Sequence, residues 1–531
     1  MSYDYIVVGA GSAGSVVAAR LSADRRCRVL LLEAGRRSKD LRIRTPGLVA
    51  TLWRTKFDWG FHTEPQKHMD RRRNYWPRGK VLGGTSCLNY MIYMRGHRAD
   101  YDGWRDLGNE GWGYDDVLPF FKRSEHNTRG ADPHHGAHGL LGVSDVSESE
   151  ICRLLTVAGA EACGVPLIDD MNAPEREGFG PFQLTVRDGR RSDTGTAFLD
   201  PAQNRHNLTV VTEALVESIT FEGTRATGVR YRHNGATVTA TAGTEVVLSA
   251  GAIGSPHLLL RSGVGPADEL QTAGVSAHHD LPGVGKNLQD HLLAPVGYEV
   301  LTDAAGNVSP LNMLGWLGRY LLKRQGPLVS SGAEAGGFVR THDAATIPDL
   351  QFHFLGTIPP IEPLDDVNYE PKGRGCSIVP TLIYPESVGE LTLRSADPEA
   401  APLIDPHYFE QEADVETLLR GVRMAHRIAD HDSVRDLLGR PLTPASHRDA
   451  TDEEIRADLR ARATTIFHPV GTCKMGSDPS AVVDAELRVR GLEGLRVADA
   501  SIMPKIVGGN TNAPTIMIGE KCATFLGAPD P

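Results

Sequence analysis

The stretch DYIVVGAGSAGSVVAARLSADRRCRVLLLE, residues 4–33, decides the fold of this chain. It reads as a short apolar strand, a glycine-rich turn, a helix over 15–22 and a second apolar strand over 28–32. A nearly continuous apolar strand is typical of a parallel sheet that is buried on both faces. The order strand, turn, helix, strand therefore predicts a Rossmann-like α/β unit.

The turn Gly9-x-Gly11-x-x-Gly14 predicts a dinucleotide site for physical reasons. Gly9 permits the tight turn, Gly11 lets backbone N–H groups approach a pyrophosphate, and Gly14 lets the helix pack closely on the strand. Glu33 ends the second strand, where a carboxylate can accept hydrogen bonds from ribose hydroxyls. That acid argues against a 2′-phosphate and so against NADP, whereas NAD and FAD both fit the motif.

Composition excludes several classes of protein. The chain has 531 residues, 40% hydrophobic and 23% charged, with a net charge of −11 and a pI of about 6.0. That length predicts more than one domain, and the absence of a basic tract argues against nucleic acid as a partner. We expect no secretory signal, because the N-terminus has no basic region or cleavage site, and no membrane span, because no apolar run approaches the roughly 18–20 residues that cross a bilayer. No metal site is expected, since the seven cysteines are scattered and form no CxxC pair. A cytoplasmic protein is predicted, with peripheral attachment to the inner membrane left open.

The rest of the chain alternates between strand-like and irregular segments. Further strands are expected at 208–211, 226–231, 245–249 and 350–355, and a helix at 414–428. The middle of the chain is richer in proline and less regular, which indicates a second domain inserted before the chain returns to the first. The predicted division is 1–295 mainly for the dinucleotide domain, 296–463 for a substrate-binding domain of α+β type, and 464–531 for the return.

Beyond the first turn, five blocks occur in a fixed order along the chain. They are GKVLGGTSCLN (79–89), GAIGSPHLLLRSGVG (251–265), GVGKNLQDH (283–291), HPVGTCKMG (468–476), and VADASIMP (497–504) with GNTNAPTI (509–516). Together with the turn, this set resembles the glucose–methanol–choline (GMC) oxidoreductases over nearly the whole length. The bacterial branch with choline, alkanol and L-sorbose dehydrogenases is the most similar.

The resemblance implies FAD, held by a discontinuous domain, with the inserted domain covering the flavin. Its predicted FAD-binding residues are Gly9, Gly11, Ser12, Ala13, Gly14, Glu33, Ala34, Gly83, Thr85, Asn89, Val216, Asp499, Ala500 and Pro514. In some relatives a histidine just before the asparagine of the first block is bonded to the flavin. Leu88 occupies that place and cannot form such a bond, so we predict non-covalent FAD.

Oxidation of an alcohol by a flavin needs a base for the hydroxyl proton and a group that stabilises the oxygen. Histidine suits the base because its ordinary pKa is near working pH. The resemblance assigns this role to His468 and the second role to Asn512. Asn510 is the nearest competitor, because a register error of two residues would exchange the asparagines. His257 and His291 are further histidines within motifs, and both are interpreted as structural.

The resemblance also bounds the substrate and the electron acceptor. A sugar, a polyol or a simple primary alcohol is the expected substrate class, and choline itself is less favoured. Reoxidation by a non-oxygen acceptor such as a quinone is preferred over an oxidase that produces hydrogen peroxide. A flavin-dependent lyase without net redox change is the competing reaction on the same fold, and the oligomeric state is left open.

Overall fold

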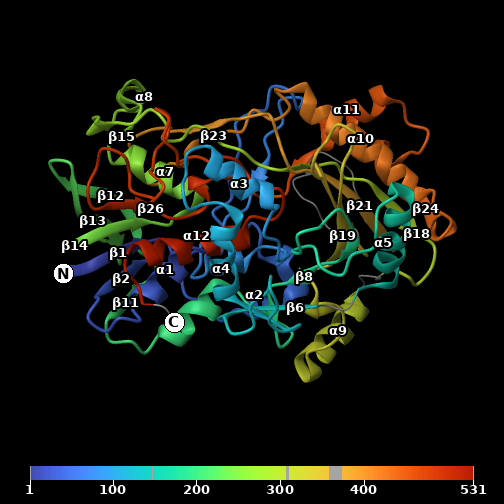
Figure 1. Cartoon of the computed structure of the whole chain (residues 1–531), viewed down its shortest axis with the longest axis horizontal. Coiled ribbons are helices and arrows are strands. Elements are labelled where there is room, and N and C mark those ends of the chain that lie inside the picture. Colours follow the sequence, from blue (N-terminus) through green and yellow to red (C-terminus); the bar gives the residue numbers. More distant parts are fainter. Residues whose placement is uncertain (1, 146–147, 306–309, 358–373, 530–531) are drawn as a thin grey trace.

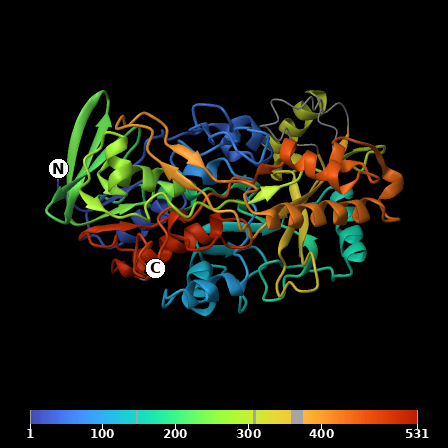
Figure 2. The same cartoon turned by 90° about the horizontal axis from the view of Figure 1, so that it is seen from above.

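The computed structural model describes residues 2–145, 148–305, 310–357 and 374–529. Two sheet-centred bodies lie next to each other along the longest axis (Figure 1). The first body, built around the sheet that contains β1 (Ser2–Val8), carries both chain termini, and the second body is built around the other large sheet. The view from above shows the same division (Figure 2). In the described part of the chain, no helix is long and apolar enough to cross a bilayer.

The first sheet is a parallel core with an antiparallel extension. Its strands are β11 (Leu208–Val211), β2 (Val29–Leu32), β1 (Ser2–Val8), β14 (Ala236–Leu248), β13 (Arg225–His233), β12 (Leu215–Glu222) and β26 (Leu495–Val497). β11, β2, β1, β14 and β26 run parallel, while β13 and β12 are antiparallel neighbours. The sheet draws strands from both ends of the chain, which confirms the prediction of a discontinuous Rossmann-like domain.

Helices from both ends of the chain also pack together in this body. The four principal ones are α1 (Gly14–Leu21), α4 (Tyr114–Ser124), α7 (Gly251–Arg261) and α12 (Asn512–Phe525). All eight residues of α1 are buried, and α12 packs on α1 and α4. Arg20 of α1 forms a bidentate pair with the buried carboxylate of Glu520 on α12, at 2.7 and 2.8 Å. Because both charges are buried and each is paired, the bridge fixes how the two ends of the chain dock.

In the described residues the second sheet contains eight strands, and those of its main path are antiparallel. They are β7 (Gly178–Pro181), β19 (Ala333–Val339), β20 (Leu350–Leu355), β21 (Gly375–Leu382), β18 (Gly297–Val300), β24 (Leu438–Pro441), β17 (Leu292–Leu293) and β25 (Thr464–Thr465). One side carries α5 (Glu150–Cys163) and α10 (Glu412–Ala429), with α11 (Asp452–Arg462) beyond them. The strand expected at 350–355 is confirmed, and the helix expected at 414–428 extends by two residues before and one after.

Candidate active site

A cavity of about 780 Å³ contains most of the predicted site residues. The predicted residues on its wall are Gly9, Gly11, Ser12, Ala13, Glu33, Ala34, Thr85, Asn89, Val216, His468, Asp499, Ala500 and Asn512. Gly14, Gly83 and Pro514 are not on the wall and lie in the elements behind it. Segments hundreds of residues apart in the chain therefore meet around one space.

The glycine-rich turn presents bare backbone to this cavity. A Cβ on Gly14 would lie 1.9 Å from the Gly9 oxygen, so only glycine permits this contact of helix and turn. A Cβ on Gly11 would meet only Gly84 Cα, at 3.9 Å, which leaves room on the cavity side. The first turn of α1 has no acidic residue and no side-chain cap, so the start of the helix suits an anionic pyrophosphate.

Two buried carboxylates hold the turns around the cavity. Glu33 accepts hydrogen bonds from the N–H groups of Ala10 (2.9 Å) and Gly35 (2.8 Å), and its burial raises its pKa to about 7. Asp499 accepts the Gly251 N–H at the start of α7 (2.9 Å) and the Ser255 hydroxyl (2.6 Å). The contacts of Asp499 explain why the block at 251–265 and the block at 497–504 occur together, since one carboxylate joins them.

Strand pairing brings a second histidine against His468, which lines the cavity. β17 pairs with β25 in the register Leu292 with Thr465, so His291 and His468 leave neighbouring strands at the same edge. Their Nδ1 atoms are 3.0 Å apart, and His291 Nε2 is 3.0 Å from the backbone oxygen of Ile383. The backbone of His468 is fixed as well, because its N–H donates to Asp290 at 2.7 Å.

This arrangement determines which nitrogen of His468 carries a proton. A carbonyl oxygen only accepts, so His291 Nε2 must donate to Ile383, and the Nδ1 of this neutral ring must accept. Burial lowers the pKa of His291 to about 3, which keeps the ring neutral. His468 then donates through Nδ1, and its Nε2 carries the lone pair that can accept a hydrogen bond or a proton.

The surroundings also keep His468 neutral. Its enclosure lowers its pKa well below 6.5, and the positive charge of nearby Arg78 lowers it further. The carboxylate of Asp290 does not contact the His468 ring. It accepts hydrogen bonds from the His468 backbone N–H and from the hydroxyls of Tyr408 and Thr465 instead. His468 is therefore a neutral imidazole at neutral pH, and its Nε2 is the acceptor.

The structure places Asn510, and not Asn512, against the free nitrogen of His468. Asn510 Nδ2 lies 3.4 Å from His468 Nε2, and its Oδ1 lies 3.5 Å from Nε2 of Gln351, a buried residue of β20. Asn512 begins α12, and its Oδ1 accepts the hydroxyl of Ser12 in the glycine-rich turn at 2.7 Å. The competitor identified from the sequence thus takes the place expected of Asn512, because the chain enters α12 between the two asparagines.

The wall around His468 is largely apolar, and sequence reasoning did not identify it. The ring of Trp53 meets the rings of Tyr90 and Phe467 edge-on, at centroid distances of 5.9 and 5.5 Å. Aliphatic side chains complete this part: Ile92, Leu293, Leu355, Val379 and Ile466. Among the described lining residues, the acids are Glu33, Asp499 and Glu399, and none of them belongs to this group. No motif marks these positions, because they come from single residues of separate segments.

Comparison with known proteins identifies the family of this chain. The GMC oxidoreductase models match residues 3–293 and 385–519. The chain belongs to the GMC oxidoreductase family. It is 43% identical to an alcohol dehydrogenase [acceptor] of Pseudomonas putida, covering 99% of this chain and 95% of that protein. It is 42% identical to the mitochondrial choline dehydrogenase of Homo sapiens, covering 99% and 89%.

Solved structures of GMC relatives have the same fold. Pyridoxine 4-oxidase from Mesorbium loti superposes with a TM-score of 0.89 at 33% identity, over 98% of both chains. A formate oxidase superposes with a TM-score of 0.92 at 28% identity, over 99% of this chain and 98% of its own. The cofactor of this GMC protein is FAD, as predicted. The bare backbone at Gly11, the uncapped start of α1 and the volume of the cavity fit that cofactor.

Proposed function

We propose that this protein oxidises an alcohol to the corresponding carbonyl compound, with His468 as the base and Asn510 as the donor to the substrate oxygen. The observation that carries the proposal is the fixed tautomer of His468, whose Nε2 lone pair faces the cavity beside an amide N–H. Bound FAD would supply the acceptor for the hydride that leaves the alcohol carbon.

Both side chains act on the same substrate atom in this proposal. A hydroxyl placed between them donates its proton to His468 Nε2 and accepts a hydrogen bond from the Asn510 amide. Negative charge that develops on the oxygen is then stabilised by a donor that is already oriented, because Gln351 holds the other end of the amide. His291 keeps the lone pair on Nε2 by occupying the opposite nitrogen of the ring.

The apolar wall narrows the substrate class within this proposal. Trp53, Tyr90 and Phe467 with their aliphatic neighbours favour a primary alcohol that carries an aliphatic or aromatic group over a sugar or a polyol. Aromatic rings also attract a quaternary ammonium, so choline belongs in the test. The electron acceptor proposed is not oxygen, in keeping with the name of the Pseudomonas putida relative.

Anaerobic flavin reduction tests the proposal directly. The holoenzyme would be mixed with long and short alkanols, benzylic alcohols, polyols, L-sorbose and choline while the oxidised flavin band is followed. Bleaching by an alcohol would support the oxidation, and admission of air would then separate an oxidase from a dehydrogenase. If none of the alcohols bleached the flavin, the proposal would fail and a lyase without net redox change would take its place.

We further propose that FAD is held without a covalent bond. Leu88 lies on the cavity wall, and its side chain has no atom that can bond to the flavin. Acid denaturation should therefore release all of the yellow colour into the supernatant. Flavin that stayed with the precipitated protein would refute the prediction.

A further inference from the structure

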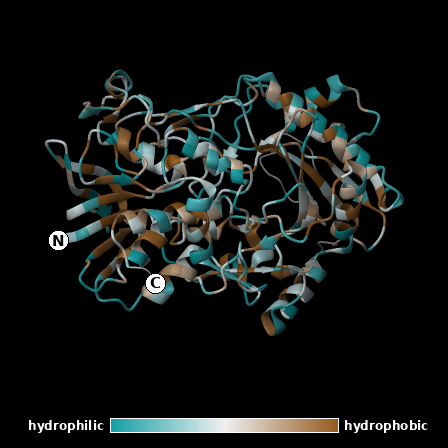
Figure 3. Ribbon diagram, viewed as in Figure 1, coloured by the Kyte–Doolittle hydropathy of each residue, from teal (hydrophilic) through white to brown (hydrophobic). Residues whose placement is uncertain are grey.

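Helix α9 (Pro310–Lys323) exposes a row of leucines to solvent. Leu311, Leu314, Leu321 and Leu322 are 83, 69, 47 and 85% exposed. At helical spacing, all four fall on one face about 100° wide. The helix stands out from the second body, and the tip of the ribbon there is strongly hydrophobic (Figures 1 and 3). Single exposed leucines are ordinary, whereas a contiguous apolar helix face usually marks an interaction site.

The same helix is basic in an otherwise acidic protein. Its sequence, PLNMLGWLGRYLLK, contains no acidic residue, while the whole chain has a net charge of −11. Arg319 and Lys323 make no ion pair in the described part of the chain, and Arg324 follows directly. An apolar face with basic residues along its border is the pattern of a helix that lies in the surface of an anionic bilayer.

A hollow lined by arginines begins where the helix ends. It measures about 540 Å³, and its charged lining residues are Arg44, Arg187, Arg190, Arg191, Arg324, Asp188 and Asp200. The guanidinium of Arg324 stacks on Tyr320 of α9 at 4.6 Å, and the Tyr320 hydroxyl donates to the Arg44 backbone oxygen at 3.2 Å. The hollow therefore adjoins the C-terminal end of α9, on the side of the helix that carries Tyr320.

The arginines of this hollow are short of acidic partners. Asp200 is engaged by Arg37, at 3.2 Å. Arg191 is 3% exposed, and its Nη2 atom, like Nη1 of Arg324, is buried without a hydrogen-bond partner among the described residues. Buried guanidinium donors without acceptors are costly unless a ligand satisfies them. A phosphate group supplies pairs of acceptor oxygens that the planar guanidinium of arginine can bind with two parallel N–H groups.

We propose that α9 and the arginine-lined hollow form a docking surface for bilayers that contain anionic phospholipids. The four leucines enter the acyl boundary, Arg319 and Lys323 lie at the headgroup level, and a headgroup phosphate occupies the hollow. This inference does not depend on the reaction that the protein catalyses. Its surface also adjoins the substrate wall: α9 leads through η4 (Pro327–Val329) to η1 (Pro46–Leu52), which packs on η4 and is followed directly by Trp53.

Vesicle flotation of the holoenzyme tests the docking surface. Two vesicle types would be used, phosphatidylcholine alone and phosphatidylcholine mixed with phosphatidylglycerol. The wild-type protein should float with the mixed vesicles and more weakly with the neutral ones. The double variant Leu314→Glu/Leu322→Glu should bind both vesicle types more weakly, by about tenfold or more in affinity for each leucine replaced. The control double variant Leu107→Glu/Leu167→Glu changes two leucines outside α9 that are 47 and 58% exposed, and it should float like the wild type.

A charge variant separates the two parts of the surface. Arg187→Glu/Arg190→Glu should weaken binding to the mixed vesicles by about fivefold or more per residue and leave the weak binding to neutral vesicles in place. Flavin absorbance and thermal unfolding would confirm that each variant is folded. Failure of the wild type to bind the mixed vesicles would overturn the proposal. So would a wild-type dimer that the leucine substitutions convert to a monomer without any vesicle binding, because a second copy would then cover the face.

Discussion

Two enclosed histidines in this protein have opposite charge states. His468 faces the cavity, and its pKa is lowered well below 6.5. His135 lies in a buried polar cluster, 4% exposed, where its pKa is raised to about 9. Burial alone lowers the pKa of both rings, since it disfavours the charged form. The difference therefore comes from the neighbours.

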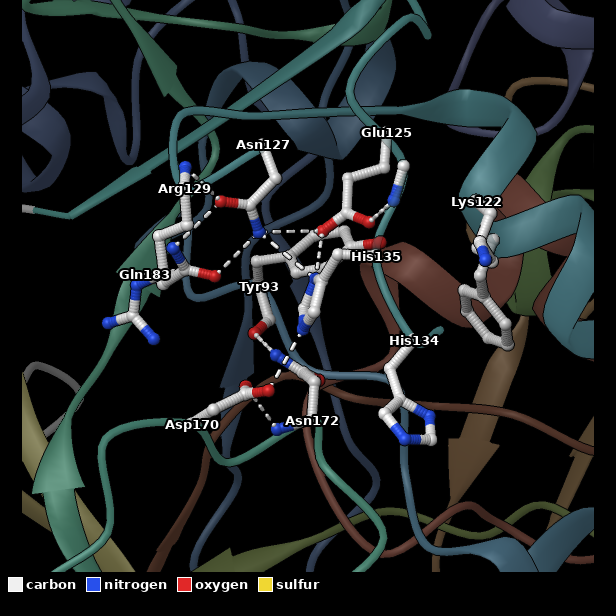
Figure 4. Close-up of polar contacts among 12 residues, drawn as sticks. Tyr93, Lys122, Glu125, Asn127, Arg129, His134, His135, Asp170, Asn172 and Gln183 are labelled. Carbon is white, nitrogen blue, oxygen red and sulfur yellow. Dashed lines mark hydrogen bonds and ion pairs between the residues drawn. The ribbon is translucent and has the colours of Figure 1, made fainter. Parts of the chain in front are cut away.

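The neighbours of His135 are carboxylates (Figure 4). Its Nδ1 is 2.8 Å from Glu125 and its Nε2 is 2.9 Å from Asp170, so both nitrogens donate, as only the protonated ring can. Glu125 is also paired with buried Arg95 at 2.6 Å. His468 has instead a second histidine on one nitrogen and an amide on the other. Neither partner of His468 carries a negative charge, so nothing offsets the lowering of its pKa by burial. The ring therefore stays neutral, as a base at neutral pH must be.

Substitution of the two histidines should have the most different effects on the rate. His468→Ala should slow flavin reduction by ~10²–10⁴ with FAD still bound, because the proton acceptor is lost. His135→Ala should leave the rate of this step unchanged in the protein that remains folded. Single-turnover absorbance at saturating alcohol measures both variants. Equal rates in the two would show that His468 is not the base.

Removal of one carboxylate should break the His135 cluster. Glu125→Gln leaves Arg95 and His135 buried with one partner fewer, which should lower the free energy of unfolding by about 3–5 kcal/mol. Urea unfolding at pH 7 measures the change. The control Asp115→Asn removes an exposed partner of Arg98 and should cost at most about 1 kcal/mol. A loss at Glu125 no larger than that of the control would mean that the cluster is not a charged network.

Substitution of Asn510 and substitution of Asn512 should change different measured quantities. Asn510→Ala should slow flavin reduction by about 10²–10³, the effect of removing one donor to a developing oxyanion. Asn512→Ala should instead weaken FAD retention, since its contact is with Ser12 in the cofactor turn. Reduction rates and the flavin content after gel filtration distinguish the two. The reverse pattern would return the catalytic role to Asn512.

The pH dependence of stability should differ in sign at the two sites. The pKa of His135 in the folded protein is above the ordinary value, so its contribution is complete below pH 6.5 and is lost as pH rises through about 9. The unfolding free energies of wild type and His135→Asn should therefore converge by up to about 3 kcal/mol over that interval. His468 and His291 have lowered pKa values, and their cost appears as pH falls below 6.5. A constant difference between wild type and His135→Asn would contradict the charged state of His135.

Local sequence patterns predicted the cofactor side of the molecule better than the substrate side. Residues 4–33 form a unit whose strand, turn and helix follow from apolar runs and glycine spacing, and the structure confirms it. Strands β19 and β21 were not predicted, because AEAGGFV and GCSIVPTL are buried throughout and contain glycine or proline. Buried strands of this kind lack the alternation that identifies a strand from sequence.

Prediction of the site residues from the sequence is limited in the same way. His468 is recognisable from its block, whereas the choice between Asn510 and Asn512 depends on where α12 begins, which the sequence does not specify to one residue. The apolar wall and the His135 cluster are assembled from residues of many separate segments. Their partners are brought together only by tertiary packing, as Glu125 and Asp170 are around His135.

The joining of the two chain ends by Arg20 and Glu520 has a consequence for synthesis in the cell. Gly9 leaves the ribosome long before His468, about 460 residues later in the chain, and translation of that interval takes roughly 20–90 s. During this time the nascent protein lacks β26, α12 and the base, so the cofactor cleft has only part of its wall. Nascent chains stalled before residue 495 should accordingly capture no flavin, and activity should appear only after release.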